Sequence, residues 1–320
     1  MKKILTIDSG GIRGIIPAIV LAEIEARLEQ PICHLFDLIA GTSAGGMLAL
    51  ALNRPKVSGS SRPLLSASEI AEFFYEWGHH IFRTRDPIPD QRRAANKCTE
   101  RIEEIFHQYF GDTRLSESIT PTLVTALDIS AGQPVFLKSM QTGRNGAVDI
   151  FMWQAARATT AIPSHFDPIS LTISGSPFSY SRQATLIDGS LFACNPAMCA
   201  FAEAQTLFPE EDDFLLISLG CGEVSREANA PNTKMKRYLL DSSLAAQSNC
   251  VDHQLQKFLP SQRYLRIQPE LAPGMNRIDS ACNQQLLEME QAARQALTEN
   301  ATTLKRIADL LAPGLKLAAA

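Results

Sequence analysis

The sequence has no excess of basic residues and no long apolar run. Its 320 residues carry 30 lysines and arginines against 34 aspartates and glutamates, a formal net charge of −4. Because proteins that bind nucleic acids present basic surfaces, we expect no nucleic acid polymer as a partner. No stretch of about 18 apolar residues could span a bilayer, and the first apolar run ends at Asp8, too early for a signal peptide. We therefore expect a cytoplasmic protein whose membrane contacts are peripheral.

Cysteine is sparse and has no regular spacing. The chain has seven cysteines, an odd number, and no C-x-x-C pair. A disulfide framework or a zinc site would need regular spacing, so we expect buried thiols in a reducing compartment, with no metal and no cofactor. The cysteines are Cys33, Cys98, Cys194, Cys199, Cys221, Cys250 and Cys282.

What the chain does contain is a repeated alternation of short apolar runs, glycine turns and helical segments. Residues 3–7 are a strand candidate, 8–14 a glycine turn and 15–30 a helix candidate. A second strand candidate at 35–40 leads through a glycine-flanked serine into a helix ending near Asn53. This order predicts a parallel sheet covered by helices. Further strands are predicted at 123–127, 134–138 and 214–219, with one ending at 186–188 and one within 263–271; further helices are predicted at 68–82, 99–110, 149–159, 234–256 and 282–311.

The glycine-flanked serine fits a nucleophile elbow. Residues 41–45 read G-T-S-A-G, the G-x-S-x-G pattern of a sharp strand-to-helix turn. Such a turn holds its central residue in a strained conformation and needs small neighbours, here Gly41 and Gly45. The hydroxyl of Ser43 would then stand at a strand end, facing a helix N-terminus that favours negative charge. A histidine base in the order of an α/β-hydrolase would be His253. However, His253 lies in a helical stretch, and only one strand candidate precedes the strand of Ser43.

Two further segments could complete such a site. The turn D-S-G-G-I-R-G at 8–14 has consecutive glycines, which let backbone amides converge on an anion. The alternative interpretations are a phosphate-binding loop and a turn without a ligand. The sequence does not contain the G-x-G-x-x-G pattern of a dinucleotide-binding loop. Asp188 follows a short apolar run and precedes Gly189, which suits a carboxylate that accepts a proton. Its alternative is an ordinary Asp-Gly turn.

Together these pieces resemble the patatin-like phospholipase family. That family carries D-G-G-G-x-R-G, G-x-S-x-G and D-G-[GA] in this order, and A-R-A-T-T-A-I-P-S-H-F-D-P at 156–168 resembles its segment before the aspartate. The resemblance covers about residues 3–220. It implies a three-layer α/β/α sandwich with a mostly parallel central sheet. It also implies one domain over 1–320, whose helical C-terminal extension covers about 230–320.

The resemblance also implies the chemistry of a lipid acyl hydrolase without a catalytic histidine. Ser43 would be the nucleophile and Asp188 its base, in a Ser–Asp dyad that forms an acyl-enzyme. The amides of Gly10, Gly11 and Ile12 would hold the oxyanion, while Arg13 orients the loop or neutralises charge. The substrate would be a phospholipid or another lipid ester at the membrane surface. Three departures from the family pattern are Ser9, in place of a glycine, Ser190, in place of a glycine or alanine, and His165, which stands where an aromatic or another residue can occur.

The sequence also bears on lipid binding, regulation and oligomeric state. Aromatic residues within 68–85 lie beside arginines, which suits acyl chains and phosphate head groups; the alternative is a core helix with a solvated face. The chain is similar in length to bacterial members of the family that cyclic nucleotides switch on, and 83–101 is the candidate segment for such an anion. A homo-oligomer stays open. A non-catalytic or ligand-gated binding protein on the same scaffold is the alternative function.

Overall fold

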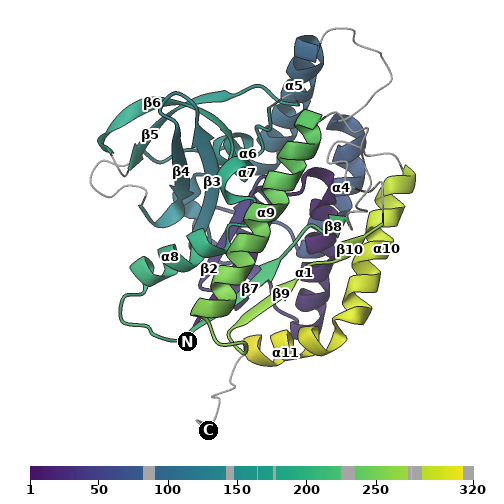
Figure 1. Ribbon diagram of the computed structural model, residues 1–320. Coiled ribbons are helices and arrows are strands. Elements are labelled where there is room, and N and C mark those ends of the chain that lie inside the picture. Colours follow the sequence, from purple (N-terminus) through teal and green to yellow (C-terminus); the bar gives the residue numbers. More distant parts are fainter. Residues whose placement is uncertain are drawn as a thin grey trace.

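The computed structural model describes residues 1–81, 91–141, 148–163, 165–175, 178–224, 235–272, 275 and 283–312. Within these residues an eight-stranded sheet forms the centre of the molecule, in the order β5-β6-β3-β2-β1-β7-β9, with β4 paired to β3. Figure 1 shows this sheet between helices. Its strands are β1 Lys2–Ile7, β2 Leu38–Thr42, β3 Thr122–Asp128, β4 Gln133–Lys138, β5 Ile169–Gly175, β6 Phe178–Asp188, β7 Phe214–Leu219 and β9 Tyr264–Ile267. A separate pair joins β8 Glu223–Val224 to β10 Glu270–Leu271.

The centre of the sheet is parallel and one side of it is antiparallel. Strand β1 lies between β2 and β7, and all three run in parallel, as do β2 with β3 and β7 with β9. Strands β4 and β6 pair with β3 in the antiparallel direction, and β5 with β6 likewise. Because the carboxyl ends of parallel strands meet at one edge of a sheet, the turns after β1 and β2 are neighbours.

Helices cover both faces of the sheet, so the predicted three-layer α/β/α fold is confirmed. Residues of β1 alternate between the two faces: Leu5 and Ile7 belong to one buried apolar cluster and Ile4 to the other. The first cluster holds α1 Ile15–Leu28, α3 Ala44–Asn53, α4 Ala67–Ile81, α5 Gln91–Phe110, α6 Met152–Thr159, α10 Asn283–Glu299 and α11 Ala301–Leu311. The second holds α8 Ala197–Leu207 and α9 Met235–Phe258. Shorter helices are η1 Gly11–Gly14, α2 Ile32–Leu35, η2 Leu115–Glu117, η3 Ser139–Gln141 and α7 Ser190–Ala193.

Some predicted elements differ from the observed ones. Strand β2 begins three residues later than predicted because 32–35 form α2, and α5 begins at Gln91 rather than at 99. The helix predicted over 282–311 is divided at Asn300 into α10 and α11. Strand β5 was not predicted. No helix among the described residues is long and apolar enough to cross a membrane.

Candidate active site

The turn after β2 has the geometry of a nucleophile elbow. Ser43 lies between β2 and α3 with φ 56° and ψ −124°, a left-handed conformation that is rare for a residue with a side chain. A Cβ on Gly41 would lie 2.1 Å from the carbonyl oxygen of Gly45, and a Cβ on Gly45 would lie 2.2 Å from that of Ile7. Both positions therefore require glycine, for the steric reason that the pattern predicted.

A threonine on another element fixes the elbow. The Ser43 amide donates a hydrogen bond to Thr159 Oγ1 at 2.9 Å. Thr159 ends α6 and is fully buried. Sequence reasoning gave Thr159 no role, although it lies in the segment 156–168 that resembles the family. The strained serine is thus fixed by a side chain that is 116 positions away in the chain.

The register of β3 brings Asp188 beside Ser43. Thr42 of β2 pairs with Thr125, and Asp188, the last residue of β6, pairs with the next residue, Ala126. Neighbouring residues of β3 thus pair with Thr42, which precedes the serine, and with the aspartate itself. The Thr42 and Thr125 hydroxyl oxygens lie 2.7 Å apart in a hydrogen bond.

Asp188 is a buried carboxyl group without a cationic partner among the described residues. Its side chain is 0% exposed, and burial raises its pKa to about 6, against an ordinary value of 3.8. The Ser43 hydroxyl, the Ser190 amide and the Ser190 hydroxyl each lower that pKa in part. At about 6, the carboxyl group is mostly ionised at neutral pH and can still accept a proton.

One oxygen of this carboxyl group is held and the other is not. The Ser190 amide donates to Asp188 Oδ1 at 2.7 Å. Oδ2 is buried and has no hydrogen bond of regular geometry, although the Ser43 hydroxyl is close enough to affect the pKa of Asp188. Catalytic hydrogen bonds are often long or misaligned without substrate. A Cβ on Gly189 would lie 2.2 Å from Thr125 Oγ1, so glycine is required here by contact with β3.

The glycine turn after β1 presents unpaired amides. The amides of Gly10, Gly11 and Ile12 make no hydrogen bond to another described residue, and Gly11 has a φ of 57°. The Arg13 amide donates to Gly10 O at 3.2 Å, so it is not available to an anion. The Arg13 side chain donates to Gly10 O at 3.4 Å and to Gly222 O at 3.0 Å. These contacts connect Arg13 to the loop and to Gly222, and an orienting role for Arg13 stays a prediction.

Ser9, which departs from the family pattern, has a backbone role. Its amide donates to Cys194 O at 2.9 Å and so does not point into the site. Since this bond needs no special backbone freedom, the serine leaves the three free amides of the loop as they are.

The residue before Ser9 is held by the C-terminal part of the chain. Asp8 is 3% exposed and pairs with Arg266 of β9, whose Nη2 lies 2.6 Å from Asp8 Oδ2. Burial raises the pKa of Asp8, and the guanidinium group opposes that rise. Sequence analysis assigned no chemistry to the region around Arg266, and no local signal there points to this contact.

A histidine base is not supported by the geometry of His253. This residue is exposed on α9 and makes no hydrogen bond to Ser43 or Asp188. Among the described residues, no group of three or more His, Cys, Asp or Glu side chains is arranged to hold a metal ion.

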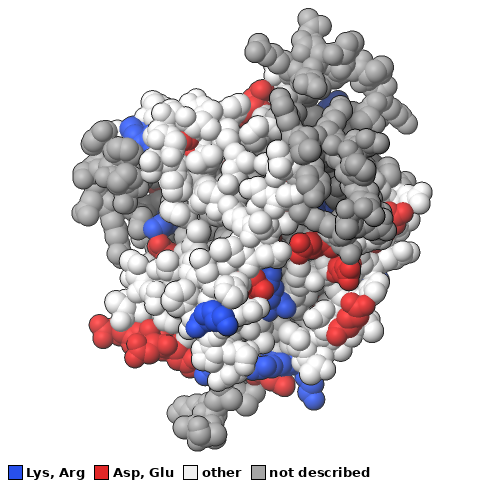
Figure 2. Space-filling model, in the orientation of Figure 1, with Lys and Arg blue, Asp and Glu red and all other residues white. Residues whose placement is uncertain are grey.

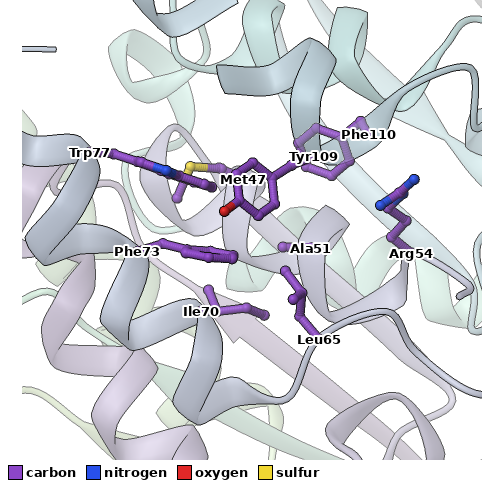
Figure 3. Close-up of a pocket in the computed structure, with 9 residues that line it drawn as sticks. All are labelled: Met47, Ala51, Arg54, Leu65, Ile70, Phe73, Trp77, Tyr109 and Phe110. Carbon is purple, nitrogen blue, oxygen red and sulfur yellow. The ribbon is translucent and has the colours of Figure 1, made fainter. Parts of the chain in front are cut away.

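An apolar pocket lies along the helix that follows the serine. Met47 and Ala51 of α3 line it with residues of α4 and α5 and with Leu65 (Figure 3). Phe73 stacks on Trp77 with ring centroids 4.4 Å apart, and both contact Tyr109 edge-on. The other lining residues are Arg54, Ile70 and Phe110. The aromatic helix predicted at 68–82 thus supplies both pocket and core, because Phe74 is buried against Gly14.

The charged side chains on the visible surface do not form one large patch of either sign. Figure 2 shows Lys and Arg interspersed with Asp and Glu over the described residues of this face. The predicted nucleotide segment, 83–101, lies partly outside the described residues, since 82–90 and the side chains of 91–94 are not described.

Comparison with known proteins agrees with the motifs. A family model described as patatin-like phospholipase matches residues 5–201. "Patatin-like protein 2" of Arabidopsis thaliana is 30% identical to this chain, covering 85% of it and 76% of that protein. "Patatin group D-3" of Solanum tuberosum is 28% identical, covering 100% of this chain and 92% of that protein. The solved structure of VipD from Legionella pneumophila aligns with 93% of this chain and 67% of that one at 12% identity and a TM-score of 0.38, which is too low to support any conclusion. The chain therefore belongs to the patatin-like phospholipase family, a family of lipid acyl hydrolases, and the predicted enzyme class, a carboxylic ester hydrolase, is confirmed.

Proposed function

We propose that this protein hydrolyses ester bonds of lipids, phospholipids among them, with Ser43 as nucleophile and Asp188 as its general base. The observation that carries the proposal is the buried Asp188 carboxyl beside the Ser43 hydroxyl, with no cation among the described residues to neutralise it. A carboxylate in this environment gains stability by taking a proton. A hydroxyl group needs such a base to become a nucleophile.

The reaction has two halves. In the first, Asp188 takes the Ser43 proton while Oγ attacks the ester carbonyl, and the amides of Gly10, Gly11 and Ile12 donate to the developing oxyanion. The tetrahedral intermediate then expels the alcohol, which leaves with the proton from Asp188. In the second half, Asp188 takes a proton from water, the hydroxide attacks the acyl-enzyme, and Ser43 regains its proton as the fatty acid leaves.

The pocket along α3 is the candidate site for the acyl chain of such a substrate, and it would have to widen on binding, because its free space holds no more than about one water molecule. Ser43 is the N-cap of α3, and the helix rises about 1.5 Å per residue. The pocket residues Met47 and Ala51 therefore follow the nucleophile by about 6 and 12 Å along the helix axis. The pocket is lined almost entirely by apolar and aromatic side chains (Figure 3), and methionine adapts its shape to flexible ligands. A chain esterified to Ser43 would run along this helix.

An activity-based probe tests the dyad. A fluorophosphonate should label the wild-type protein and should label neither Ser43→Ala nor, at more than trace rates, Asp188→Asn. His253→Ala is the control and should be labelled like the wild type. Labelling that survives Ser43→Ala, or that is lost in His253→Ala, would contradict the dyad. A protein that is inert to the probe and to a lipid mixture, with and without a panel of cyclic nucleotides, would favour the non-catalytic binding role.

A pocket-filling variant tests the acyl site. Ala51→Phe should reduce hydrolysis of long-chain esters by about tenfold or more, because a missing or blocked contact of this size discriminates by about 1–3 kcal/mol. Hydrolysis of a butyryl ester, whose chain is too short to reach position 51, is the internal control and should stay unchanged. An equal loss on both substrates would mean that the chain binds elsewhere.

Three predictions from the sequence stay predictions. They are action at the membrane surface, activation by a cyclic nucleotide through 83–101, and a homo-oligomer. The lipid digest with a nucleotide panel, followed by mass spectrometry, tests the first two together, and light scattering tests the third.

A further inference from the structure

One row of side chains crosses three strands behind the glycine turn. Thr6 of β1 pairs with Ser218 of β7, which pairs with Arg266 of β9. Side chains of paired residues lie on the same face of a sheet, and so does Asp8, two residues after Thr6. Because Ser218 is small, the long Arg266 side chain can pass over it and reach Asp8, which follows the end of β1.

Arg266 is almost entirely enclosed by polar partners. Its side chain is 11% exposed. Nη2 donates to Asp8 Oδ2 at 2.6 Å and Nη1 approaches Oδ1 at 3.4 Å. Nη1 also donates to Ser218 Oγ at 2.6 Å, and Nη2 to Ser248 Oγ at 3.2 Å. Asp252 lies 3.9 Å from Nε. Four hydrogen bonds from Nη1 and Nη2, with a carboxylate near Nε, fix the guanidinium group in position and in angle.

Asp8 connects Arg266 to both parts of the candidate site, the oxyanion loop and the nucleophile elbow. Its carbonyl oxygen accepts from Cys221 Sγ at 3.2 Å, and its backbone lies against the elbow, since a Cβ on Gly45 would come within 2.6 Å of Asp8 O. The free amides of the loop begin two residues later, at Gly10. A shift of Asp8 would therefore change the distance between the loop amides and the turn that carries Ser43.

We propose that Arg266 is a positioning residue for the oxyanion loop, which it holds in register with the nucleophile elbow through Asp8. The inference rests on the proposed function. It extends the machinery of the reaction to β9, outside residues 5–201 that match the family model. Strand β9 is thus required for the rate of the reaction, beyond its role in covering the sheet.

The chain offers a matched control on the same pair of strands. Arg263 forms a similar two-pronged pair with Asp213, with Nε 2.5 Å from Oδ1 and Nη2 2.9 Å from Oδ2. This pair lies at the opposite end of β7 and β9, away from the loop. The experiment compares Arg266→Met with Arg263→Met. It measures the rate constant of fluorophosphonate labelling, kcat and KM on one lipid ester, and the melting temperature.

The single variant leaves the Asp8 charge buried without its partner, so it can lose stability for that reason alone. The double variant Asp8→Asn with Arg266→Met removes both charges and keeps this effect small. We expect folded Arg266→Met and the double variant to be labelled 10- to 100-fold more slowly than the wild type, since displacement of about 1 Å costs such factors. The loss should fall on kcat rather than KM. Arg266→Lys, which keeps the positive charge but not the planar fork of donors, should recover part of the rate.

Labelling of the folded double variant at the wild-type rate would overturn the proposal, and so would an equal loss in Arg263→Met. Failure of the proposed function itself looks different. In that case the wild-type protein is not labelled, or its labelling survives Ser43→Ala.

Discussion

The candidate site contains two buried aspartates, Asp8 and Asp188, which differ in their charged partners. Asp8 and Asp188 are 3% and 0% exposed, and each stands where a strand ends. Asp8 has the Arg266 guanidinium group against it, whereas Asp188 has only the Ser190 amide and neighbouring hydroxyls. Burial raises the pKa of both carboxyl groups.

The partner decides what each carboxylate can do. A carboxylate bonded to a guanidinium group keeps its charge and its place, because proton uptake would leave the cation uncompensated. Burial alone would lower the pKa of Arg266, but Asp8 and neighbouring groups raise it above its ordinary value. Asp188, with no such partner, can exchange a proton near neutral pH. One aspartate therefore suits support and the other suits proton transfer.

The strongest test of this contrast is to remove each charge in turn, beginning with Asp188. Asp188→Asn should lower kcat by about 10²–10⁴-fold, the usual contribution of a general base. The free energy of unfolding should stay equal to that of the wild type or increase, because a buried, unpaired charge is lost while a carbonyl oxygen remains for the Ser190 amide. Steady-state kinetics and urea unfolding measure the two. A large loss of stability would show that Asp188 holds the fold rather than a proton.

Asp8→Asn should show the opposite pattern in stability. It leaves the Arg266 guanidinium group buried without its carboxylate, which costs about 3–5 kcal/mol. The loss should lie toward the lower end of that range, because Asp252 remains 3.9 Å from Arg266 Nε. Urea unfolding beside Asp188→Asn gives the comparison directly. If the two variants lose the same stability, the difference between the two carboxylates is not the one proposed.

Acidification should lower the activity of the protein and raise the contribution of Asp188 to its stability. Protonated Asp188 cannot act as a base, so kcat/KM should fall about tenfold per pH unit below about 6. The folded-state pKa of Asp188, about 6, lies above the ordinary 3.8, so the folded state binds the proton more tightly than the unfolded state. Acidification from pH 7 to below 3.8, the ordinary value of the unfolded chain, should therefore add about 3 kcal/mol of stability from this group.

Asp188→Asn isolates that contribution, since every other titrating group is shared. The difference in unfolding free energy between the variant and the wild type should be largest at pH 7 and should vanish only below pH 3.8. A difference that does not change with pH would mean that the pKa of Asp188 is not raised.

The candidate site shows which features a sequence can predict. The elbow at Ser43 was predictable because its demands are local: a positive φ and two small neighbours within five residues. Asp188 was placed only as a strand-end carboxylate beside a glycine, together with a resemblance. Its contact with Ser43 arises because β6 and β2 pair with neighbouring residues of β3. The order of strands in a sheet cannot be predicted from a local sequence pattern.

The features that sequence reasoning missed are mostly long-range. Thr159 reaches Ser43 across 116 positions, and Arg266 reaches Asp8 across 258. Neither residue stands out locally, since a threonine at a helix end and an arginine in a short strand are common. Strand β5 is a different case. Its Ile169, Leu171 and Ile173 alternate with polar residues, which is the usual strand signal, so this element could have been predicted.

The smallest expected effect concerns the residue that departs from the family pattern beside Asp188. The Ser190 hydroxyl lowers the pKa of Asp188, whereas the Ser190 amide, which any residue would keep, bonds Oδ1. Ser190→Ala should therefore raise the pKa of Asp188. It should reduce kcat/KM at pH 6 by about two- to threefold and leave it unchanged at pH 8. The effect is small because Ser190 Oγ makes no hydrogen bond of regular geometry, so its loss costs less than the roughly 1 kcal/mol of a typical hydrogen bond. A pH profile of the variant beside the wild type measures the shift. A loss of equal size at every pH would make the hydroxyl part of the reaction, since a changed pKa has no effect once the carboxyl group is fully ionised.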